Sequence, residues 1–410
     1  MTDCTVDAEY DRLREVRVHE PGIEALIGAT DPAPNHFSRS FSVREARSEH
    51  RTMVETLESA GVTVRYLHED LDGALDDLLA ERIGIDETGS HAPDREEILA
   101  NVDAQTAYER LQALLVGPTF GRTSDDPAEQ TGPDSPANCA SSVAVERPIS
   151  NIYFQRDCQI VGDRGPILPR PATPTRQRES QVVETAWRAI GAEFAGRTSA
   201  PHTLEGGDFL PADEFALVGT SAVVDGAEHV LRTSYDGGRE LLETGAVGYD
   251  EVGLVRPPLA ADERLAEKHG TSSRLMHLDG WLNIAADGLA VGRKPLLDAA
   301  TVEVFNRAGD GYAHRETESL TELLHRHDYE IIDAPYEERW ATNFLTVDDG
   351  AVVAIHETDA DGYDPENNHT IDRLTAAGVD VLPDGEGLNP ENLTNGGGGI
   401  HCMTSPIRRE

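Results

Sequence analysis

Four short hairpins, each with two apolar strands around an aspartate, glycine or proline turn, recur along this chain at irregular spacing. They read CQIVGDRGPIL (158–168), DFLPADEFALVG (208–219), LNIAADGLAVG (282–292) and FLTVDDGAVVAI (344–355). Turns of the Asp-Gly type between β-rich segments favour tight antiparallel pairing. The pattern therefore predicts a fold assembled from repeated small β-units.

A second repeated unit consists of a helix, a glycine and a strand. Ser42 and Glu45 form a capping box ahead of apolar residues at helical spacing, and Gly61 can then take the left-handed conformation. LESAGVTVR (57–65) returns closely as LTAAGVDVL (374–382), and more loosely as WRAIGAEF and LLHRHDYEII. Such helix–strand units predict an α/β fold of blades around an axis rather than a doubly wound sheet.

Residues 71–147 break this pattern. Two stretches, LDGALDDLLAERIG and REEILANVDAQTAYERLQALLVG, have helical character, and the proline- and serine-rich TSDDPAEQTGPDSPANC follows them. We therefore predict two parts. Residues 1–70 and 148–410 form the α/β unit, and residues 71–147 form a helical insertion with a flexible link.

Polar side chains stand directly before or at the start of each hairpin. NIYFQRD places Asp157 before the first, LEGGD places Glu205 and Asp208 at the second, and MHLDGW places His277 and Asp279 before the third. ERWATN (338–343) precedes the fourth. If equivalent strand starts meet around an axis, these side chains converge on one pocket.

A pocket of this kind would hold several carboxylates, one imidazole and the thiol of Cys402, provided that the glycine-rich end NGGGGIHCM folds back into it. Carboxylates at fixed angles match a planar guanidinium, which stays protonated. A neighbouring cation would favour the thiolate of Cys402, and His277 could transfer protons. The sequence therefore predicts a site for an organic cation.

Two simpler interpretations compete with this one. His277 and carboxylates could instead bind a metal ion, although no HxxxH, HxH or HExxH spacing occurs, so we predict no metal. Any single acid could be a capping or solvated residue, and His277 could be a structural histidine. The presence of polar clusters at equivalent points of a repeated unit favours a shared site.

Charge is extreme, with 75 acidic against 35 basic residues and a formal net charge of −40. The acids are dispersed, and Lys268 and Lys294 are the only lysines, which is typical of a surface that stays hydrated in concentrated salt. Nucleic-acid binding is disfavoured because phosphate contacts need clustered positive charge. With no apolar stretch of about 18 residues and no signal-peptide pattern, we expect a cytoplasmic, halophilic protein that does not bind membranes.

The motifs FQRD, LEGGD, HLD and HCM, together with TRQRES (175–180), resemble those of arginine deiminases. This family lies within the guanidino-group-modifying enzymes, which include amidinotransferases. The resemblance covers almost the whole chain. It implies a five-bladed ββαβ propeller, the pentein fold, with a helical insert, a guanidino substrate and no cofactor.

The resemblance also implies roles for individual residues. Cys402 would be the nucleophile, His277 the general acid and base, and Glu205 the residue that orients His277. Substrate-binding residues would be Asp157, Asp279, Arg176, Asp208 and Asn151, with Arg176 on the substrate carboxylate. The implied reaction converts L-arginine to citrulline and ammonia through a covalent thiouronium intermediate on the cysteine.

Some positions depart from the family pattern. The glycine run Gly396–Gly399 carries no arginine, and VGTSAVV stands after the second hairpin where a GERT-like turn is expected. Four alternatives therefore stay open. The substrate could be another guanidino compound, or the amidino group could be transferred to an amine instead of water. The protein could also be a non-catalytic guanidinium-binding protein or a metal-dependent hydrolase. Exposed hairpins and the insertion could also mediate a homo-oligomer.

Overall fold

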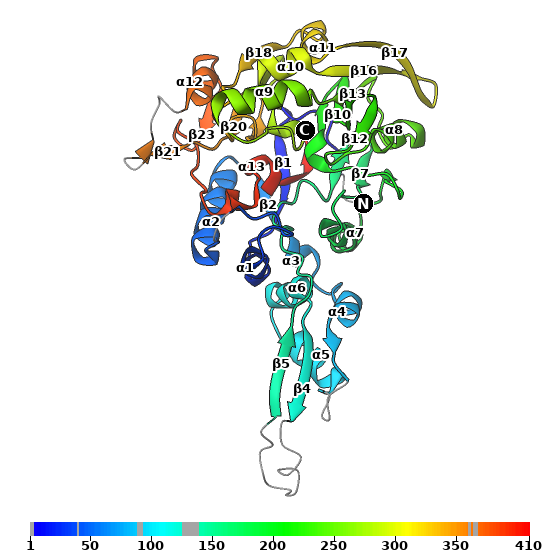
Figure 1. Ribbon diagram of the computed structural model, residues 1–410, viewed down its shortest axis with the longest axis vertical. Coiled ribbons are helices and arrows are strands. Elements are labelled where there is room, and N and C mark those ends of the chain that lie inside the picture. Colours follow the sequence, from blue (N-terminus) through cyan, green and yellow to red (C-terminus); the bar gives the residue numbers. More distant parts are fainter. Residues whose placement is uncertain (1–3, 39–40, 88–92, 125–138, 360–361, 364–367) are drawn as a thin grey trace, which may run out of the picture.

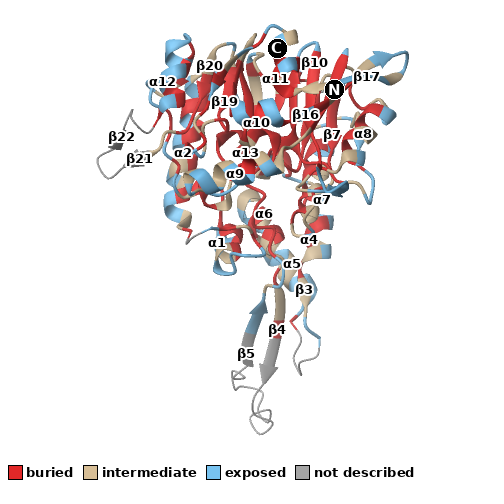
Figure 2. Ribbon diagram, turned by 45° about the horizontal axis from the view of Figure 1, so that its top comes forward, coloured by how far each residue is buried: buried red, intermediate tan, exposed pale blue. Residues whose placement is uncertain are grey.

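The computed structural model describes residues 4–38, 41–87, 93–124, 139–359, 362–363 and 368–410. The chain forms a broad α/β body from which a narrow projection extends, as Figure 1 shows. The strands of the body are largely buried (Figure 2). Among the described residues, no helix combines the length and hydropathy that crossing a bilayer requires.

Five three-stranded units of the body share one pairing plan, in which the first strand pairs antiparallel with the second and the second pairs in parallel with the third. The strands are β6 (Ile160–Gly162), β7 (Gly165–Leu168) and β8 (Gly196–Arg197); β9 (Phe209–Ala212), β10 (Phe215–Gly219) and β13 (Glu251–Arg256); β14 (Leu282–Ala286), β15 (Leu289–Gly292) and β18 (Glu330–Asp333); β19 (Leu345–Asp348), β20 (Ala351–Val353) and β23 (Asp380–Leu382); and β24 (Ser405–Arg409), β1 (Leu13–Val18) and β2 (Thr63–Tyr66). The four predicted hairpins are thereby confirmed. The fifth unit joins the two ends of the chain.

Helices connect the second strand of each unit to the third. They are α7 (Glu179–Ala189), α8 (Tyr235–Thr244), α11 (Leu320–Arg326), α12 (His369–Ala376) and α2 (Val43–Ser59). The predicted cap at α2 is present, because the Ser42 side chain accepts a hydrogen bond from the Glu45 N–H. The left-handed residue after α2 is Gly61, with φ of 83°, whereas Asp328 with φ of 60° takes that place after α11. The looser repeat LLHRHDYEII thus keeps the left-handed turn after its helix although it has no glycine there.

Several elements enlarge the second and third units. The hairpin of β16 (Thr301–Ala308) and β17 (Gly311–Ser319) extends the sheet of the second unit, in the order β17-β16-β13-β10-β9. A separate ribbon is formed by β11 (Ala222–Val224) and β12 (Ala227–His229), while α9 (Leu259–His269) and α10 (Lys294–Ala299) pack nearby. Neither hairpin was predicted from the sequence.

The projection contains more than the predicted helices. Its helices are α4 (Asp76–Arg82), α5 (Arg95–Asp103) and α6 (Ala107–Val116), preceded by α3 (Leu67–Asp70). A small sheet of β3 (Gly84–Ile85), β4 (Thr119–Ser124) and β5 (Cys139–Ala144) accompanies them. Leucines of this region, such as Leu79 and Leu115, join Val182 of α7 in one apolar cluster, so the projection is packed onto the body. The predicted flexible link falls largely on residues 125–138, outside the described residues.

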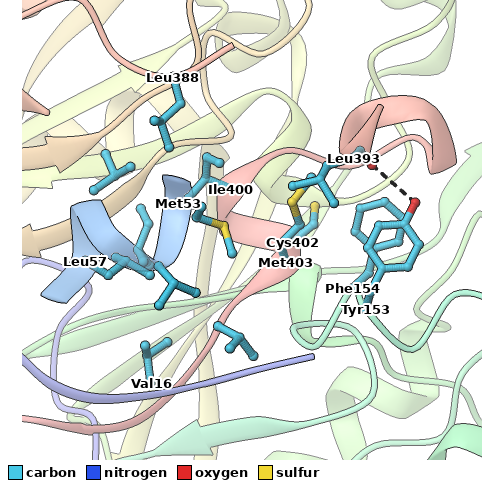
Figure 3. Close-up of a cluster of buried hydrophobic side chains, with 14 of the residues drawn as sticks. Val16, Met53, Leu57, Tyr153, Phe154, Leu388, Leu393, Ile400, Cys402 and Met403 are labelled. Atoms are coloured by element: carbon cyan, nitrogen blue, oxygen red, sulfur yellow. Dashed lines mark hydrogen bonds between the residues drawn. The ribbon is translucent and has the colours of Figure 1, made fainter. Parts of the chain in front are cut away.

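The C-terminal segment is buried rather than frayed. The short helix η5 (Leu393–Gly396) is followed by α13 (Ile400–Met403), whose residues Ile400, Cys402 and Met403 pack into a core cluster with residues of α2 and β1 (Figure 3). In the same cluster the Tyr153 hydroxyl donates a hydrogen bond to the Leu393 carbonyl, at 3.2 Å. Apolar packing therefore holds a glycine-rich tail that would be costly to order by itself.

Candidate active site

A cavity of about 400 Å³ opens beside the buried tail. Of the predicted residues, Asn151, Asp157, Arg176, His277, Asp279 and Cys402 line it. Glu205 lies behind His277 and contacts it directly. Segments far apart in the sequence thus bring carboxylates, an imidazole and a thiol to one place, as the arrangement of polar clusters predicted.

His277 lies between two carboxylates. Its Nε2 is 2.7 Å from Glu205 Oε2, and its Nδ1 is 3.6 Å from Asp157 Oδ1. The glycines of LEGGD allow this approach: a Cβ on Gly207 would stand 2.8 Å from His277 Cγ, and one on Gly206 would stand 2.0 Å from the Arg156 carbonyl oxygen. Any side chain at either position would displace the imidazole or the neighbouring backbone.

The surroundings of His277 favour its charged form. Burial disfavours an imidazolium, but Asp157 and Glu205 outweigh this effect and raise the pKa of His277 to about 10. Burial by itself would raise the pKa of Glu205, but the hydrogen bond from His277 lowers it to about 2. At neutral pH the pair is therefore an imidazolium held by a carboxylate, and His277 carries a proton that it can donate.

Cys402 lies in α13 with its thiol between an amide and a carboxylate. Asn343 Nδ2 donates to Cys402 Sγ at 3.2 Å, and the thiol lies 3.4 Å from Asp279 Oδ2. Asn343 Oδ1 accepts hydrogen bonds from the Gly399 and Cys402 N–H groups, at 2.8 and 3.3 Å. A Cβ on Gly398 would stand 2.6 Å from the Phe154 ring, so the glycine run also permits close packing there.

The thiol of Cys402 is neutral when the cavity holds no cation. Burial raises its pKa well above the usual value, and the charges of Asp279 and Asp157 raise it further, while the hydrogen bond from Asn343 acts in the opposite direction. Burial alone would raise the pKa of Asp279, but the hydrogen bond from His401, at 2.8 Å, lowers it. Asp279 is thus an anion beside an uncharged thiol.

Arg176 is bound within the protein. Its guanidinium forms ion pairs with Asp157 and with Glu179, the latter at 2.7 Å, and Nη2 also donates to the carbonyl oxygens of Asn151 and Phe154. Although Arg176 lines the cavity, it is only 4% exposed. These contacts fix Asp157 and leave few donors for the substrate carboxylate that the resemblance assigned to Arg176.

Asp208 and Asn151 occupy different positions. Asp208 does not line the cavity; its Oδ1 accepts a hydrogen bond from the Leu278 N–H, at 2.9 Å, and so holds the segment that carries His277 and Asp279. Burial raises the pKa of Asp208 to about 6. Asn151 does line the cavity and is 2% exposed. Direct substrate contact thus stays a prediction for Asn151, whereas Asp208 is placed to act through the backbone.

Three arginines that the sequence analysis did not select line the cavity: Arg232, Arg274 and Arg339. Arg232 follows the β11–β12 ribbon in the chain and does not stand directly after the second hairpin, where the resemblance places a GERT-like turn. Arg232 Nη1 lies 3.8 Å from Glu205 Oε2. The tripeptide RTS at residues 232–234, ahead of the Ser234 cap of α8, was the signal that could have identified it.

Asp157, Glu205 and His277 could also hold a metal ion, since each offers one ligand atom and these atoms lie within 4.8 Å of one another. In the present geometry His277 Nε2 is already hydrogen-bonded to Glu205, and Asp157 is ion-paired with Arg176. His277 Nδ1 and Asp157 Oδ1 have no hydrogen-bond partner among the described residues, but protonation of His277, whose pKa is raised to about 10, would oppose the binding of an ion.

The fold defines the class first. A solved amidinotransferase from Microseira wollei is similar to this chain with a TM-score of 0.55 at 14% identity, covering 99% of this chain and 97% of that one. An inosamine-phosphate amidinotransferase from Streptomyces griseus gives a TM-score of 0.52 at 15% identity, covering 100% and 97%. The chain therefore has the mixed α/β fold of amidinotransferases.

Sequence comparison then gives the family. A family model described as arginine deiminase matches residues 36–409. The arginine deiminase of Halobacterium salinarum is 33% identical to this chain, over 100% of this chain and 97% of the relative. The chain belongs to the arginine deiminase family.

Proposed function

We propose that this protein hydrolyses L-arginine to L-citrulline and ammonia, with Cys402 as the nucleophile. The observation that carries the proposal is the position of the Cys402 thiol, 3.4 Å from Asp279 Oδ2, in the cavity that His277 and Asp157 also line. Full-length similarity to arginine deiminases supports arginine as the substrate.

In this proposal Asp157 and Asp279 bind the guanidinium. Asp157 Oδ1 and His277 Nδ1 are buried and have no hydrogen-bond partner in the described structure. The N–H groups of a planar guanidinium would donate to Asp157 Oδ1, which can only accept while it is ionised. Arg176 holds the other oxygen of Asp157 and so fixes the direction of the free one.

The substrate itself would activate the nucleophile. A guanidinium beside Cys402 offsets the charges of Asp279 and Asp157 that disfavour the thiolate, and so lowers the thiol pKa on binding. The thiol proton passes by way of Asp279 Oδ2, 3.4 Å from Sγ, to solvent, and the thiolate attacks the guanidinium carbon to form a C–S bond. A tetrahedral adduct results, in which one C–N bond can break.

His277 would then act twice. As an imidazolium it donates its proton to the departing nitrogen, so that ammonia leaves and a cationic thiouronium remains on Cys402. The neutral imidazole next removes a proton from water, whose oxygen attacks the same carbon. The C–S bond breaks with its electron pair returning to sulfur, the hydroxyl proton of the adduct passes to the thiolate, and citrulline is released. Glu205 keeps the imidazole oriented throughout.

We further propose that the five units close into a five-bladed ββαβ propeller, the pentein fold, around this cavity. Contacts between neighbouring units support a closed order. Strand β24 contacts β6, Ile160 and Phe209 share an apolar cluster, β9 contacts β14, and β14 and β1 both contact β19. Each unit thus touches the next, and the last touches the first.

The decisive assay supplies arginine alone and then arginine with an amine acceptor, in high salt and after exhaustive chelation. Equal amounts of citrulline and ammonia support the hydrolase. Ornithine that forms only with the added amine would identify an amidinotransferase, and loss of rate on chelation would identify a metal-dependent hydrolase. Arginine binding without any product would leave a non-catalytic guanidinium-binding protein.

A further inference from the structure

Two buried arginines beside the cavity have no carboxylate partner. Arg274 is 8% exposed and Arg293 is 1% exposed. Although the chain has 75 acidic residues, no carboxylate oxygen of the described residues lies within 4.0 Å of either guanidinium. A buried guanidinium without an anion is costly, so this pair requires an explanation.

Backbone carbonyl groups supply most of the contacts of both side chains. Arg274 donates to the carbonyl oxygens of Tyr336 and Glu337, both at 3.1 Å, and Arg293 donates to those of Pro335 and Glu338. Both guanidinium carbons lie near the Tyr336 ring, at 5.4 and 5.6 Å from its centroid. The two arginines therefore fix the same loop by the same kind of contact.

No nearby carboxylate of the described residues neutralises either guanidinium by direct contact. Asp262, a buried carboxylate of this region, is occupied by the Tyr336 hydroxyl at 2.7 Å and by the backbone N–H of Arg274 at 3.1 Å. Burial lowers the pKa of Arg274 and lowers that of Arg293 to about 10, and for Arg293 the like charge of Arg274 adds to the effect. The charges of Asp262, Glu357 and Glu337 act in the opposite direction on Arg274, and those of Glu338 and Asp262 do so on Arg293, but none of these carboxylates contacts either guanidinium.

One feature separates the two arginines. Arg274 lines the cavity, three residues before His277, whereas Arg293 does not. Arg274 Nη1 has no hydrogen-bond partner among the described residues and is not among the fully enclosed unpartnered atoms. Arg274 therefore presents a donor and a positive charge to the same space that Cys402 and Asp279 face.

We propose that Arg274 is a specificity-determining residue whose guanidinium binds the carboxylate of the substrate in this cavity. The inference rests on the proposed function and adds to it, because Arg176, the residue assigned to that carboxylate by resemblance, is ion-paired internally with Asp157 and Glu179. A carboxylate is the anion that an otherwise unpaired buried guanidinium requires.

Binding calorimetry on a Cys402→Ser background tests this with two ligands. L-Arginine carries the carboxylate, and L-argininamide replaces it with a neutral group of similar shape. Arg274→Gln should weaken arginine binding by about 10- to 100-fold, the usual factor for a charge-assisted hydrogen bond, and argininamide binding by less than about threefold. Arg274→Lys should restore part of the arginine affinity.

Arg293→Gln is the matched control, because it removes contacts to the same loop without reaching the cavity. It should change the affinities for the two ligands by the same factor, which isolates any loosening of the loop. Equal losses for both ligands in Arg274→Gln, or identical profiles for Arg274→Gln and Arg293→Gln, would overturn the inference. If the Cys402→Ser parent binds no arginine, the proposed function itself fails.

Discussion

Two groups of side chains meet at the cavity, and they are built differently. The reactive set comprises Asp157, Glu205, His277, Asp279 and Cys402; the rim set comprises Arg232, Arg274 and Arg339. Members of the reactive set are at most 4% exposed and are joined to one another or to a fixed partner. In the rim set, Arg339 is exposed and stacks on Trp340, 4.5 Å from the ring centroid.

The difference separates chemistry from recognition. A closed hydrogen-bonded set tolerates little change, because removing one member leaves a buried charge or polar atom unpaired. In the rim set, Arg274 is held by backbone carbonyls and Arg339 by a ring, so a substitution at either position leaves no member of the reactive set unpaired. We therefore expect substitutions in the reactive set to lower kcat and those in the rim set to raise KM.

The largest effect is expected for Cys402→Ser. A hydroxyl at this position is a poor nucleophile without a strong base, so kcat should fall by at least about 10⁴-fold while arginine binding is retained. Steady-state rates and calorimetry measure the two quantities separately. Activity within tenfold of the unmodified protein would remove Cys402 from the mechanism.

His277→Gln should follow, with a loss in kcat of about 10²- to 10⁴-fold. Glutamine can keep a hydrogen bond to Glu205 but cannot transfer protons at either step. Measurement of ammonia release in single turnovers checks this. A change confined to KM would assign His277 to binding rather than to proton transfer.

Stability should respond to pH through the same histidine. Because the folded pKa of about 10 lies above the ordinary histidine value of 6.5, protonated His277 stabilises the fold fully below pH 6.5, and this contribution is lost as pH rises toward 10. The free energy of unfolding, measured with denaturant, should fall over this range by on the order of a few kcal/mol more in the unmodified protein than in His277→Gln. Parallel pH profiles would contradict the raised pKa.

Arg232→Gln should have a smaller effect, raising KM for arginine about tenfold while kcat changes less than about threefold. The reason is that Arg232 lies at the cavity wall, 3.8 Å from Glu205, without contacting His277 through any hydrogen bond described. Initial rates over a wide range of arginine concentration separate the two parameters. A dominant fall in kcat would place Arg232 in the reactive set.

The smallest effect on kcat is expected from salt, which should instead change the stability of the protein through its charged surface. Paired, buried charges are screened weakly, so kcat at saturating arginine should change less than about threefold between moderate and molar KCl. With a formal net charge of −40, exposed acids repel one another in dilute buffer, and even Asp72 and Asp76, with side chains 68% and 71% exposed, share a single arginine, Arg110. The melting temperature should therefore rise with KCl, and a constant value would contradict a salt-adapted surface.

Local patterns in the sequence predicted the repeating part of the fold. Turns with aspartate or glycine, of the Asp-Gly type in two of them, marked the four hairpins, and the cap at Ser42 with the glycine at position 61 marked α2 and its strand. The β16–β17 hairpin was missed because β17 is mostly exposed and polar, so it lacks the apolar alternation that identifies strands. Local chemistry thus predicted elements best where one face is buried.

For the site, the sequence predicted which residues gather but not how each is used. Cys402, His277 and Asp279 come to one cavity because equivalent ends of a repeated unit meet there. The commitment of Arg176 to Glu179 and the isolation of Arg274 from carboxylates depend on packing between distant segments. No spacing rule in the sequence encodes such partner choices.

Trapping the covalent intermediate tests the central claim most directly. Acid quenching during turnover of arginine, followed by peptide mapping with mass spectrometry, should find a thiouronium adduct on the peptide that contains Cys402, and none in Cys402→Ser. The adduct should disappear at the rate at which citrulline forms. An active preparation with the thiol of Cys402 unmodified at every time point, or with the adduct on another residue, would contradict the account.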